Sequence, residues 1–314
     1  MRWPLDIMAP NQPSKQNKDG DLSSTLVGCD EVSCPKEGIN DRCTVEDNTF
    51  LSIGLSRIPA VPSSLEGFSL VKGVNVSAGQ AGNDNDNDKP TRSFRSFYYL
   101  GTPSDVETRD LSGCVVVFND APSKKFNQNG NDVRAASGNC SDVIDKTCIE
   151  RLTEKATELA DEADGNVCTS LERELKSTSL DERNGFAGNG GNLGNFTVKL
   201  LGDLNAVKNS SDCWPIQPKS DQLIEIASVT AINDYTATAL YDEAYKITPV
   251  LTVFTGNDNS SVVDKTASQL TCLKVLTEED PSDDENSSEN SAVAVKASGF
   301  AAGIAVLAGI FALL

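Results

Sequence analysis

The chain has 314 residues, and 27 Lys and Arg stand against 46 Asp and Glu, so its formal charge at pH 7 is −19. Nucleic-acid binding needs clustered basic side chains, so this balance argues against a nucleic-acid partner. The sequence has no histidine, which excludes Ser-His-Asp and Cys-His catalysis and any imidazole metal ligand. No motif marks a catalytic residue, a cofactor site or a metal site.

Strand-like runs separated by turns fill the first part of the chain. We expect strands within residues 44–60 and over 68–76, 93–100 and 114–118, because these runs alternate or are rich in β-branched and aromatic residues. The intervening 79–90 and 119–139 are polar and rich in Gly and Asn, which predicts loops. Asp84, Asp86 and Asp88 resemble the start of a calcium loop, but the glycine and glutamate that such a loop needs are missing.

The pattern changes to a helical period in the middle of the chain. Apolar residues recur there at spacings of three and four, namely Ile144, Cys148, Leu152, Ala156, Leu159 and Ala163. This spacing predicts an amphipathic helix, with Ser141 as a candidate N-cap. A second helix is expected over about 167–177.

Strands resume in the last third of the folded region. They are expected over 196–201, 222–232, 248–255 and 269–276, whereas 235–246 fits either a strand or a helix. The order of strands, helical pair and strands predicts an α+β fold, mainly an antiparallel β-sheet or sandwich with a two-helix insertion over about 141–178 and disulfide staples. We expect a single ectodomain over 27–277.

The C-terminal region has the pattern of a glycosylphosphatidylinositol (GPI) attachment signal. Residues 299–314 have no polar side chain, and they follow a short spacer and a group of small residues. This order of small residues, spacer and apolar tail predicts attachment at Asn290, with Asn286 as the alternative, and removal of 291–314. Residues 278–290 form an acidic stalk that we expect to be disordered. The competing interpretation is a tail anchor or a buried C-terminal helix.

The N-terminal residues 1–26 do not fit this interpretation. They are polar and lack the apolar stretch of a signal peptide, although a GPI signal acts only after entry into the secretory pathway. We expect that the recorded start is wrong, that a signal peptide is missing and that 1–26 is a disordered or mis-assigned lead. The alternative is that the tail is not a GPI signal.

Cysteines and glycosylation sequons favour secretion. The nine disulfide candidates are Cys29, Cys34, Cys43, Cys114, Cys140, Cys148, Cys168, Cys213 and Cys272, and none forms a C-x-x-C pair. Such spacing is typical of disulfides in an oxidising compartment, but it leaves the pairing open. We expect the first three to staple the N-terminal segment, Cys148 and Cys168 to clip the helices, and Trp214 to pack on a disulfide. Glycosylation is predicted at Asn75, Asn195, Asn209 and Asn259.

Several short segments resemble those of a known group of proteins. They are VGCDEVSCP at 27–35, GLSRIP at 54–59, FYYLGTP at 97–103, CWP at 213–215, ITPVLTVF at 247–254 and LTCLKV at 270–275. The chain resembles uncharacterised secreted, often GPI-anchored proteins of filamentous ascomycete fungi over nearly the whole ectodomain. The resemblance implies secretion and a signal peptide just before residue 27, and it implies no catalytic residues.

These observations predict a GPI-anchored cell-surface or cell-wall glycoprotein with a structural, adhesive or interaction role and no catalytic activity. Its expected partners are the membrane, through the lipid anchor, and cell-wall polysaccharide. The alternative is a carbohydrate-active enzyme or glycan-binding module that uses carboxylates only. A secreted effector that acts on a host is a third hypothesis, which the sequence does not separate from the first.

Overall fold

Two five-stranded antiparallel sheets form the body of the protein. The computed structural model describes residues 26–29, 31–34, 43–50, 52–59, 62–77, 90–121, 138–162, 166–177, 194–209, 213–256, 262–276 and 293–294. Sheet I has the order β3-β4-β5-β9-β8 and sheet II the order β12-β11-β10-β6-β7. This arrangement confirms the predicted α+β fold dominated by antiparallel strands.

The strands occupy most of the predicted runs. In sheet I they are β3 (Ser52–Arg57), β4 (Ser69–Val76), β5 (Thr91–Thr102), β8 (Ala206–Val207) and β9 (Gln222–Asp234). In sheet II they are β6 (Gly113–Phe118), β7 (Phe196–Leu200), β10 (Thr248–Phe254), β11 (Ala267–Leu273) and β12 (Val293–Ala294). A separate hairpin pairs β1 (Thr44–Val45) with β2 (Asn48–Thr49).

The two sheets pack face to face. Alternate residues of the strands point between them, so that Leu70 and Leu100 of sheet I pack in one cluster with Val115, Val117 and Val250 of sheet II. All five side chains are fully buried. Because side chains alternate along a strand, the same strands send a second apolar set to the outer faces, which therefore also need a cover.

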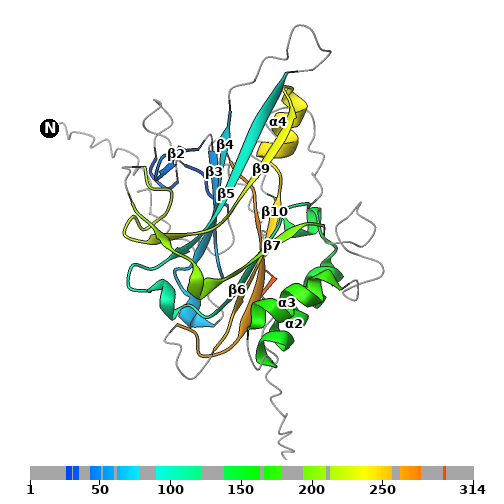
Figure 1. Ribbon diagram of the computed structural model, residues 1–314. Coiled ribbons are helices and arrows are strands. Elements are labelled where there is room, and N and C mark those ends of the chain that lie inside the picture. The colour runs from blue at the N-terminus through cyan, green and yellow to red at the C-terminus, as the bar shows by residue number, and fades with distance from the viewer. Residues whose placement is uncertain are drawn as a thin grey trace, which may run out of the picture.

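A pair of helices covers the outer face of sheet II (Figure 1). They are α2 (Lys146–Asp161) and α3 (Val167–Lys176), which confirms the predicted two-helix insertion. Leu152 and Leu171 pack in the same cluster as Val116 and Leu251 of the sheet. The predicted N-cap is wrong, because Asp145 caps α2 by accepting a hydrogen bond from the backbone of Thr147.

Short connecting elements and one further helix complete the described fold. The 3-10 turns are η2 (Ser63–Leu65), η3 (Thr108–Asp110), η4 (Cys140–Asp142) and η6 (Leu201–Asp203). Residues 235–246, which fit a strand or a helix, contain helix α4 (Ala237–Ala244), which Thr236 caps. Figure 1 shows α4 beside the projecting end of the β5–β9 pair.

An N-terminal cover lies on the outer face of sheet I. We use this name for residues 26–29, 31–34 and 43–50 together with 213–221. Its buried side chains include Phe50 and Trp214, which share a cluster with Val71, Phe97 and Tyr99 of the sheet. The Trp214 indole donates a hydrogen bond to the carbonyl of Asp221 over 3.1 Å.

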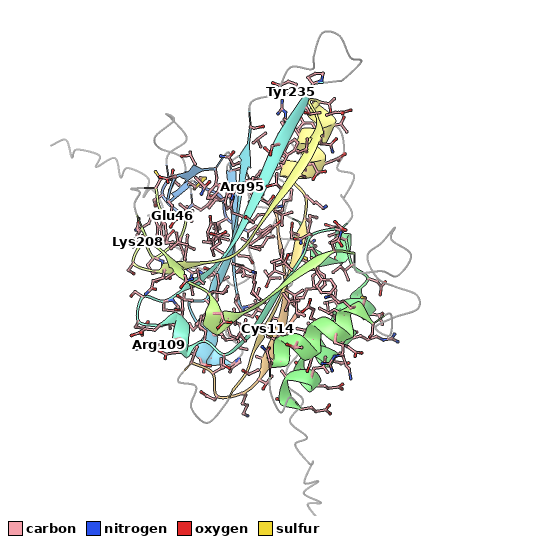
Figure 2. The ribbon with its side chains drawn as sticks, viewed as in Figure 1. Glu46, Arg95, Arg109, Cys114, Lys208 and Tyr235 are labelled. Carbon is pink, nitrogen blue, oxygen red and sulfur yellow. A yellow bond between two sulfur atoms is a disulfide. The ribbon has the colours of Figure 1, made fainter. Side chains whose placement is uncertain are left out.

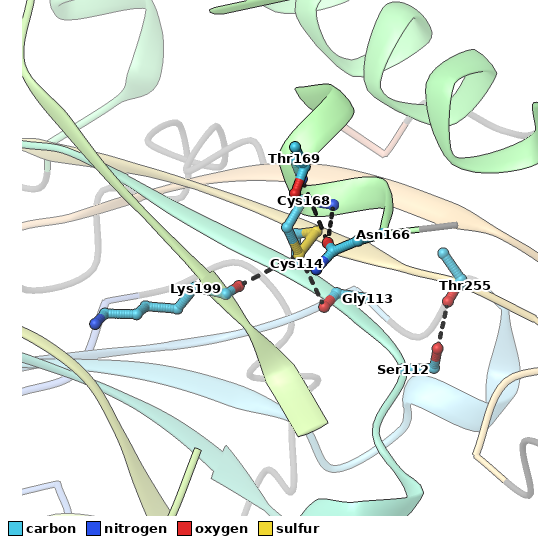
Figure 3. The surroundings of a disulfide bond; sticks show 8 residues. All are labelled: Ser112, Gly113, Cys114, Asn166, Cys168, Thr169, Lys199 and Thr255. Carbon is cyan, nitrogen blue, oxygen red and sulfur yellow. Dashed lines mark hydrogen bonds between the residues drawn. A yellow bond between two sulfur atoms is a disulfide. The ribbon is translucent and has the colours of Figure 1, made fainter. Parts of the chain in front are cut away.

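Three disulfides join cysteines within the described residues. Cys29 and Cys43 close the N-terminal cover as predicted, and Cys140 bonds Cys272 with their Cα atoms 5.2 Å apart. The predicted clip between Cys148 and Cys168 is wrong, because Cys168 of α3 bonds Cys114 of β6 instead (Figure 3). The helices are thus bonded to the sheet rather than to each other, since Cys168 faces β6 at the helix–sheet boundary.

Several predicted features lie outside the described residues. These are the lead 1–25, the loops at 79–89 and 122–137, the stalk at 278–290, the tail at 295–314, and Asn259, Asn286 and Asn290. Within the predicted spacer, β12 pairs with Gln269 and Leu270 of β11. In the described part of the chain, no helix is long and apolar enough to cross a membrane.

Candidate functional site

A groove of about 530 Å³ opens between strand β7 of sheet II and strand β9 of sheet I. We call it the edge groove. It is lined by Glu46, Thr197, Lys199, Asp203, Leu204, Asn205, Ala206, Val207, Glu225, Ile226, Ala227 and Ser228. These residues come from the β1–β2 turn, from β7, from the η6–β8 connection and from β9, so both sheets contribute to the walls.

The groove lies where strands β7 and β9 diverge. Strand β7 is the last strand of sheet II, and η6 and β8 connect it to sheet I. Figure 1 shows β7 and β9 separating from the end at which this connection lies. Among the described residues, β8 pairs with β9 only at Leu223 and Ile224. Beyond Ile224, therefore, the described strands leave one edge of β9 without a neighbour.

The backbone edge of β9 forms one wall. Glu225 to Ser228 are four consecutive residues, and all four line the groove. Consecutive side chains of a strand point to opposite faces of the sheet. Four consecutive residues can therefore line one groove only if the groove runs along the edge of the strand. Ile226 has no partner in β5, because Tyr98 pairs with Ala227 and Tyr99 with Glu225. This β-bulge lies within the wall, and bulges commonly redirect side chains at binding sites.

The groove carries a net negative charge. Three carboxylates, of Glu46, Asp203 and Glu225, and one ammonium, of Lys199, line it. All four residues are exposed. Burial raises the pKa of the neighbouring Tyr99, and the negative charges of Glu225 and then Glu46 raise it further. Both carboxylates therefore act on the same hydroxyl group.

Glu46 depends on a tight turn for its position. It lies between β1 and β2 with φ at 51°, in the left-handed region. The hairpin belongs to the N-terminal cover, which the Cys29–Cys43 disulfide closes. Figure 2 places Glu46 on the side of the molecule opposite the helices α2 and α3, near Lys208. The groove therefore takes one of its acids from the cover of sheet I.

Two of the predicted glycosylation sites flank the groove. Asn195 lies just before β7 and Asn209 shortly after β8, and both are exposed. Asn75 lies on β4, where it is half-buried and donates a hydrogen bond from Nδ2 to the carbonyl of Thr49 over 3.0 Å. Glycans at Asn195 and Asn209 would project beside the groove mouth. The side chain of Asn75, in contrast, would have to break its hydrogen bond to Thr49 before it could carry a glycan.

The chemistry of the groove differs from that expected of a sugar cleft. No aromatic side chain is among the described residues that line it, and Trp214 is buried in the N-terminal cover. No group of three His, Cys, Asp or Glu in the described part of the chain is arranged to hold a metal ion. None of the groove residues was singled out by a sequence motif, because the contributing segments are far apart in the chain and individually ordinary.

A second cluster of polar groups is closed inside the protein. Lys72 of β4 donates from Nζ to the carbonyl of Lys246 over 2.6 Å and to Oγ1 of Thr248 over 3.2 Å. Burial lowers the pKa of Lys72 to about 7, and the charges of Lys246 and Lys274 lower it as well. The Lys72 side chain is almost fully buried, so this cluster belongs to the packing of the core and the edge groove remains the candidate site.

Comparisons with known proteins assign no family. The chain matches no protein-family model, no curated protein and no solved structure. The groove, together with the sequence features that indicate where the protein acts, is therefore the guide to its function.

Proposed function

We propose that the protein is a surface glycoprotein that a GPI anchor holds outside the cell and that binds an extended partner in the edge groove without catalysis. The C-terminal signal pattern, the sequons and the disulfides support the location. The edge groove supports the binding role, because it combines net negative charge with a strand edge that the described strands leave unpaired.

The partner that fits this groove best is an extended, positively charged polypeptide segment. An extended chain adds to a free strand edge by backbone hydrogen bonds, while side-chain contacts supply selectivity. The carboxylates of Glu46, Asp203 and Glu225 would attract Lys or Arg side chains of the partner. The net negative charge of the whole chain also disfavours a second copy of this protein as the partner.

Location is tested on the native protein from its own cells. We expect phosphatidylinositol-specific phospholipase C to release it from membranes, and the C-terminal peptide to end at Asn290 or Asn286 with a glycolipid. The control is mock treatment of the same membranes. A mature chain that still contains residues 299–314 would overturn the anchoring proposal.

Binding is tested with fluorescent ten-residue peptides in which Lys alternates with Val, and with a matched Glu–Val peptide. We expect binding of the first peptide only, and weakening as salt rises. Methylation of alternate backbone nitrogens should weaken binding about tenfold or more when the methylated edge faces β9, because each lost hydrogen bond is worth roughly 0.5–1.5 kcal/mol. Equal binding of methylated and unmethylated peptides would overturn strand addition.

A second candidate function has its own supporting observation. Glu46 and Glu225 share the groove and act on the same tyrosine, and a pair of carboxylates is the minimum set for glycoside hydrolysis. The test is hydrolysis of reduced, dye-labelled β-1,3-glucan and chitin oligosaccharides by the wild type and by Glu225→Gln. Turnover that the substitution abolishes would favour the enzyme, and binding without turnover would favour a glycan-binding module.

A further inference from the structure

Four cysteines meet in the N-terminal cover. Cys29, Cys34 and Cys43 come from the start of the ectodomain, and Cys213 comes from the connection between β8 and β9. Cys29 and Cys43 are bonded to each other. Cys34 and Cys213 belong to none of the three disulfides, although both are buried, with 0% and 5% of their surface exposed.

Cys34 and Cys213 lie in the same buried cluster of the N-terminal cover. Lys219 donates from Nζ to the Cys34 sulfur over 3.7 Å and also to the carbonyl of Trp214, the residue that follows Cys213. Burial raises the pKa of Cys34, and the neighbouring Cys213 thiol raises it further. Backbone hydrogen bonds hold both cysteines in place, because Cys34 donates to the carbonyl of Cys29 over 2.9 Å and Thr44 donates to the carbonyl of Cys213 over 3.1 Å. The pair is therefore fixed by the fold rather than brought together by an accidental side-chain rotation.

We propose that Cys34 and Cys213 form a fourth disulfide, which bonds the N-terminal segment to the β8–β9 connection. The shared buried cluster, the Lys219 hydrogen bonds to Cys34 and to Trp214, and the backbone hydrogen bonds at both cysteines carry this assignment. Cys148 belongs to none of these four disulfides. It lies in the helical layer on sheet II, and the whole sandwich separates it from the N-terminal cover.

Bond formation requires an oxidant, which we identify as a low-molecular-weight disulfide such as oxidised glutathione. The Cys213 thiolate attacks one glutathione sulfur and displaces a glutathione thiolate, which leaves a mixed disulfide. The Cys34 thiolate then attacks the Cys213 sulfur and displaces the second glutathione. The two cysteines lose two electrons and two protons, and the disulfide of the oxidant becomes two glutathione thiols.

Burial of Cys34 in the folded protein implies that the disulfide forms early in folding. The pKa of Cys34 is raised by burial to about 12, so the folded protein would hold it as an unreactive thiol. We therefore expect the bond to form before the cover closes over sheet I. Once formed, the Cys34–Cys213 bond would tie the N-terminal segment to the β8–β9 connection close to the Glu46 hairpin. The backbone of Thr44 in β1 already donates a hydrogen bond to the carbonyl of Cys213.

The pairing is tested by mapping the full-length protein secreted from cells into an oxidising medium. The protein is unfolded without reductant, alkylated with N-ethylmaleimide and digested with trypsin and an Asp/Glu-specific protease. Acidic residues separate Cys29 from Cys34, and Lys36 and Arg42 separate Cys34 from Cys43, so each cysteine falls on its own peptide.

The expected result is a Cys34 peptide linked to a Cys213 peptide, lighter than their sum by a pair of hydrogen atoms, together with an alkylated Cys148. In a Cys34→Ser variant, Cys213 should become alkylated, whereas Cys148→Ser should leave the linkage intact. Alkylation of both Cys34 and Cys213 in the wild type would overturn the proposal, as would a bond from Cys34 to Cys29 or Cys43. Mapping of the wild type decides the question even if the variants fail to fold, and its outcome is independent of ligand binding in the edge groove.

Discussion

The two outer faces of the sandwich are covered in different ways. On sheet II, α2 and α3 bury side chains such as Val116, and on sheet I the irregular N-terminal cover buries Phe97 equally well. A helix satisfies most of its backbone hydrogen bonds within itself. The N-terminal cover instead takes partners from other segments, as in the bonds between Val27 and Leu55.

Because of this difference, the disulfides have different roles in the two covers. The helices already pack through their apolar faces. The Cys114–Cys168 bond joins α3 to β6, and the Cys140–Cys272 bond joins the 3-10 turn η4, just before α2, to β11. The N-terminal cover has one two-stranded hairpin and few regular elements, so its aromatic side chains and its cysteines define its path. Substitutions that act on one cover at a time can test this contrast.

The largest effect is expected from Phe50→Ala in the N-terminal cover. Phe50 is fully buried, and its ring centroid lies 5.4 Å from that of Phe97. Removal of a buried aromatic ring costs about 3–5 kcal/mol, so urea unfolding should show a large loss of stability. The matched control is Leu152→Ala in the helical layer, which should cost about 2–5 kcal/mol. A loss below about 1 kcal/mol for Phe50→Ala would show that the cover contributes little to stability.

The next effect concerns the bond between α3 and β6. The double variant Cys114→Ser/Cys168→Ser should lose about 2–5 kcal/mol of unfolding free energy, because the bond restricts the unfolded chain. Cys148→Ala is the control for the loss of a buried cysteine outside the disulfides. Unfolding followed by circular dichroism measures both. Equal stabilities of the double variant and the wild type would contradict the fastening role of this bond.

A third test uses the buried Lys72, a residue of β4 whose side chain points away from the N-terminal cover and bonds Thr248 of sheet II. Its pKa of about 7 in the folded protein is lower than the usual 10.5, so between these values the unfolded chain binds more protons. Stability should therefore rise with pH, by about 2 kcal/mol between pH 7 and pH 9. The penalty for burying the charge is fully present below pH 7.

Lys72→Met should remove this contribution, so its stability should change less over the same pH range. Chemical unfolding at several pH values gives the slope of unfolding free energy against pH for each protein. In the difference between the two slopes, the contributions of groups that titrate in both proteins cancel. Lys246, Lys274 and Glu243 act on Lys72 and remain in the variant. The same pH dependence in both proteins would show that Lys72 titrates near its ordinary value.

The sequence predicts the regular parts of the two covers better than the irregular ones. The repeat of Leu152 and Ala156 predicts α2, because helical periodicity is a local property. The N-cap is displaced from Ser141 to Asp145 because a separate 3-10 turn occupies 140–142. Residues 237–244 are ambiguous as a sequence, and packing of Ala244 and Tyr245 beside Val74 and Phe94 favours the helix.

The edge groove was not predictable in the same way. Glu46 and Glu225 are distant in sequence, and each is an ordinary exposed acid until the fold places both beside Tyr99. The bulge at Ile226 likewise depends on the register between β5 and β9. Pairing of Cys168 with Cys114 has the same origin, since tertiary packing rather than spacing decides which cysteines meet.

The smallest effect on stability is expected in the groove, where the effect on binding should be largest. Glu46→Gln/Glu225→Gln should change the unfolding free energy by no more than about 0.5 kcal/mol, because both side chains are exposed. Affinity for the Lys–Val peptide should fall about tenfold, and its salt dependence should become shallower, because two attractive charges are lost.

The control for this variant is Glu150→Gln/Glu154→Gln, which also removes two acids, both exposed, from α2 on the helical layer. It changes the net charge without altering the groove, so it should leave peptide affinity unchanged. If both variants weaken binding equally, the attraction comes from the overall charge of −19. A selective effect of the groove variant would instead show that the partner is bound in the edge groove, to which the N-terminal cover contributes Glu46.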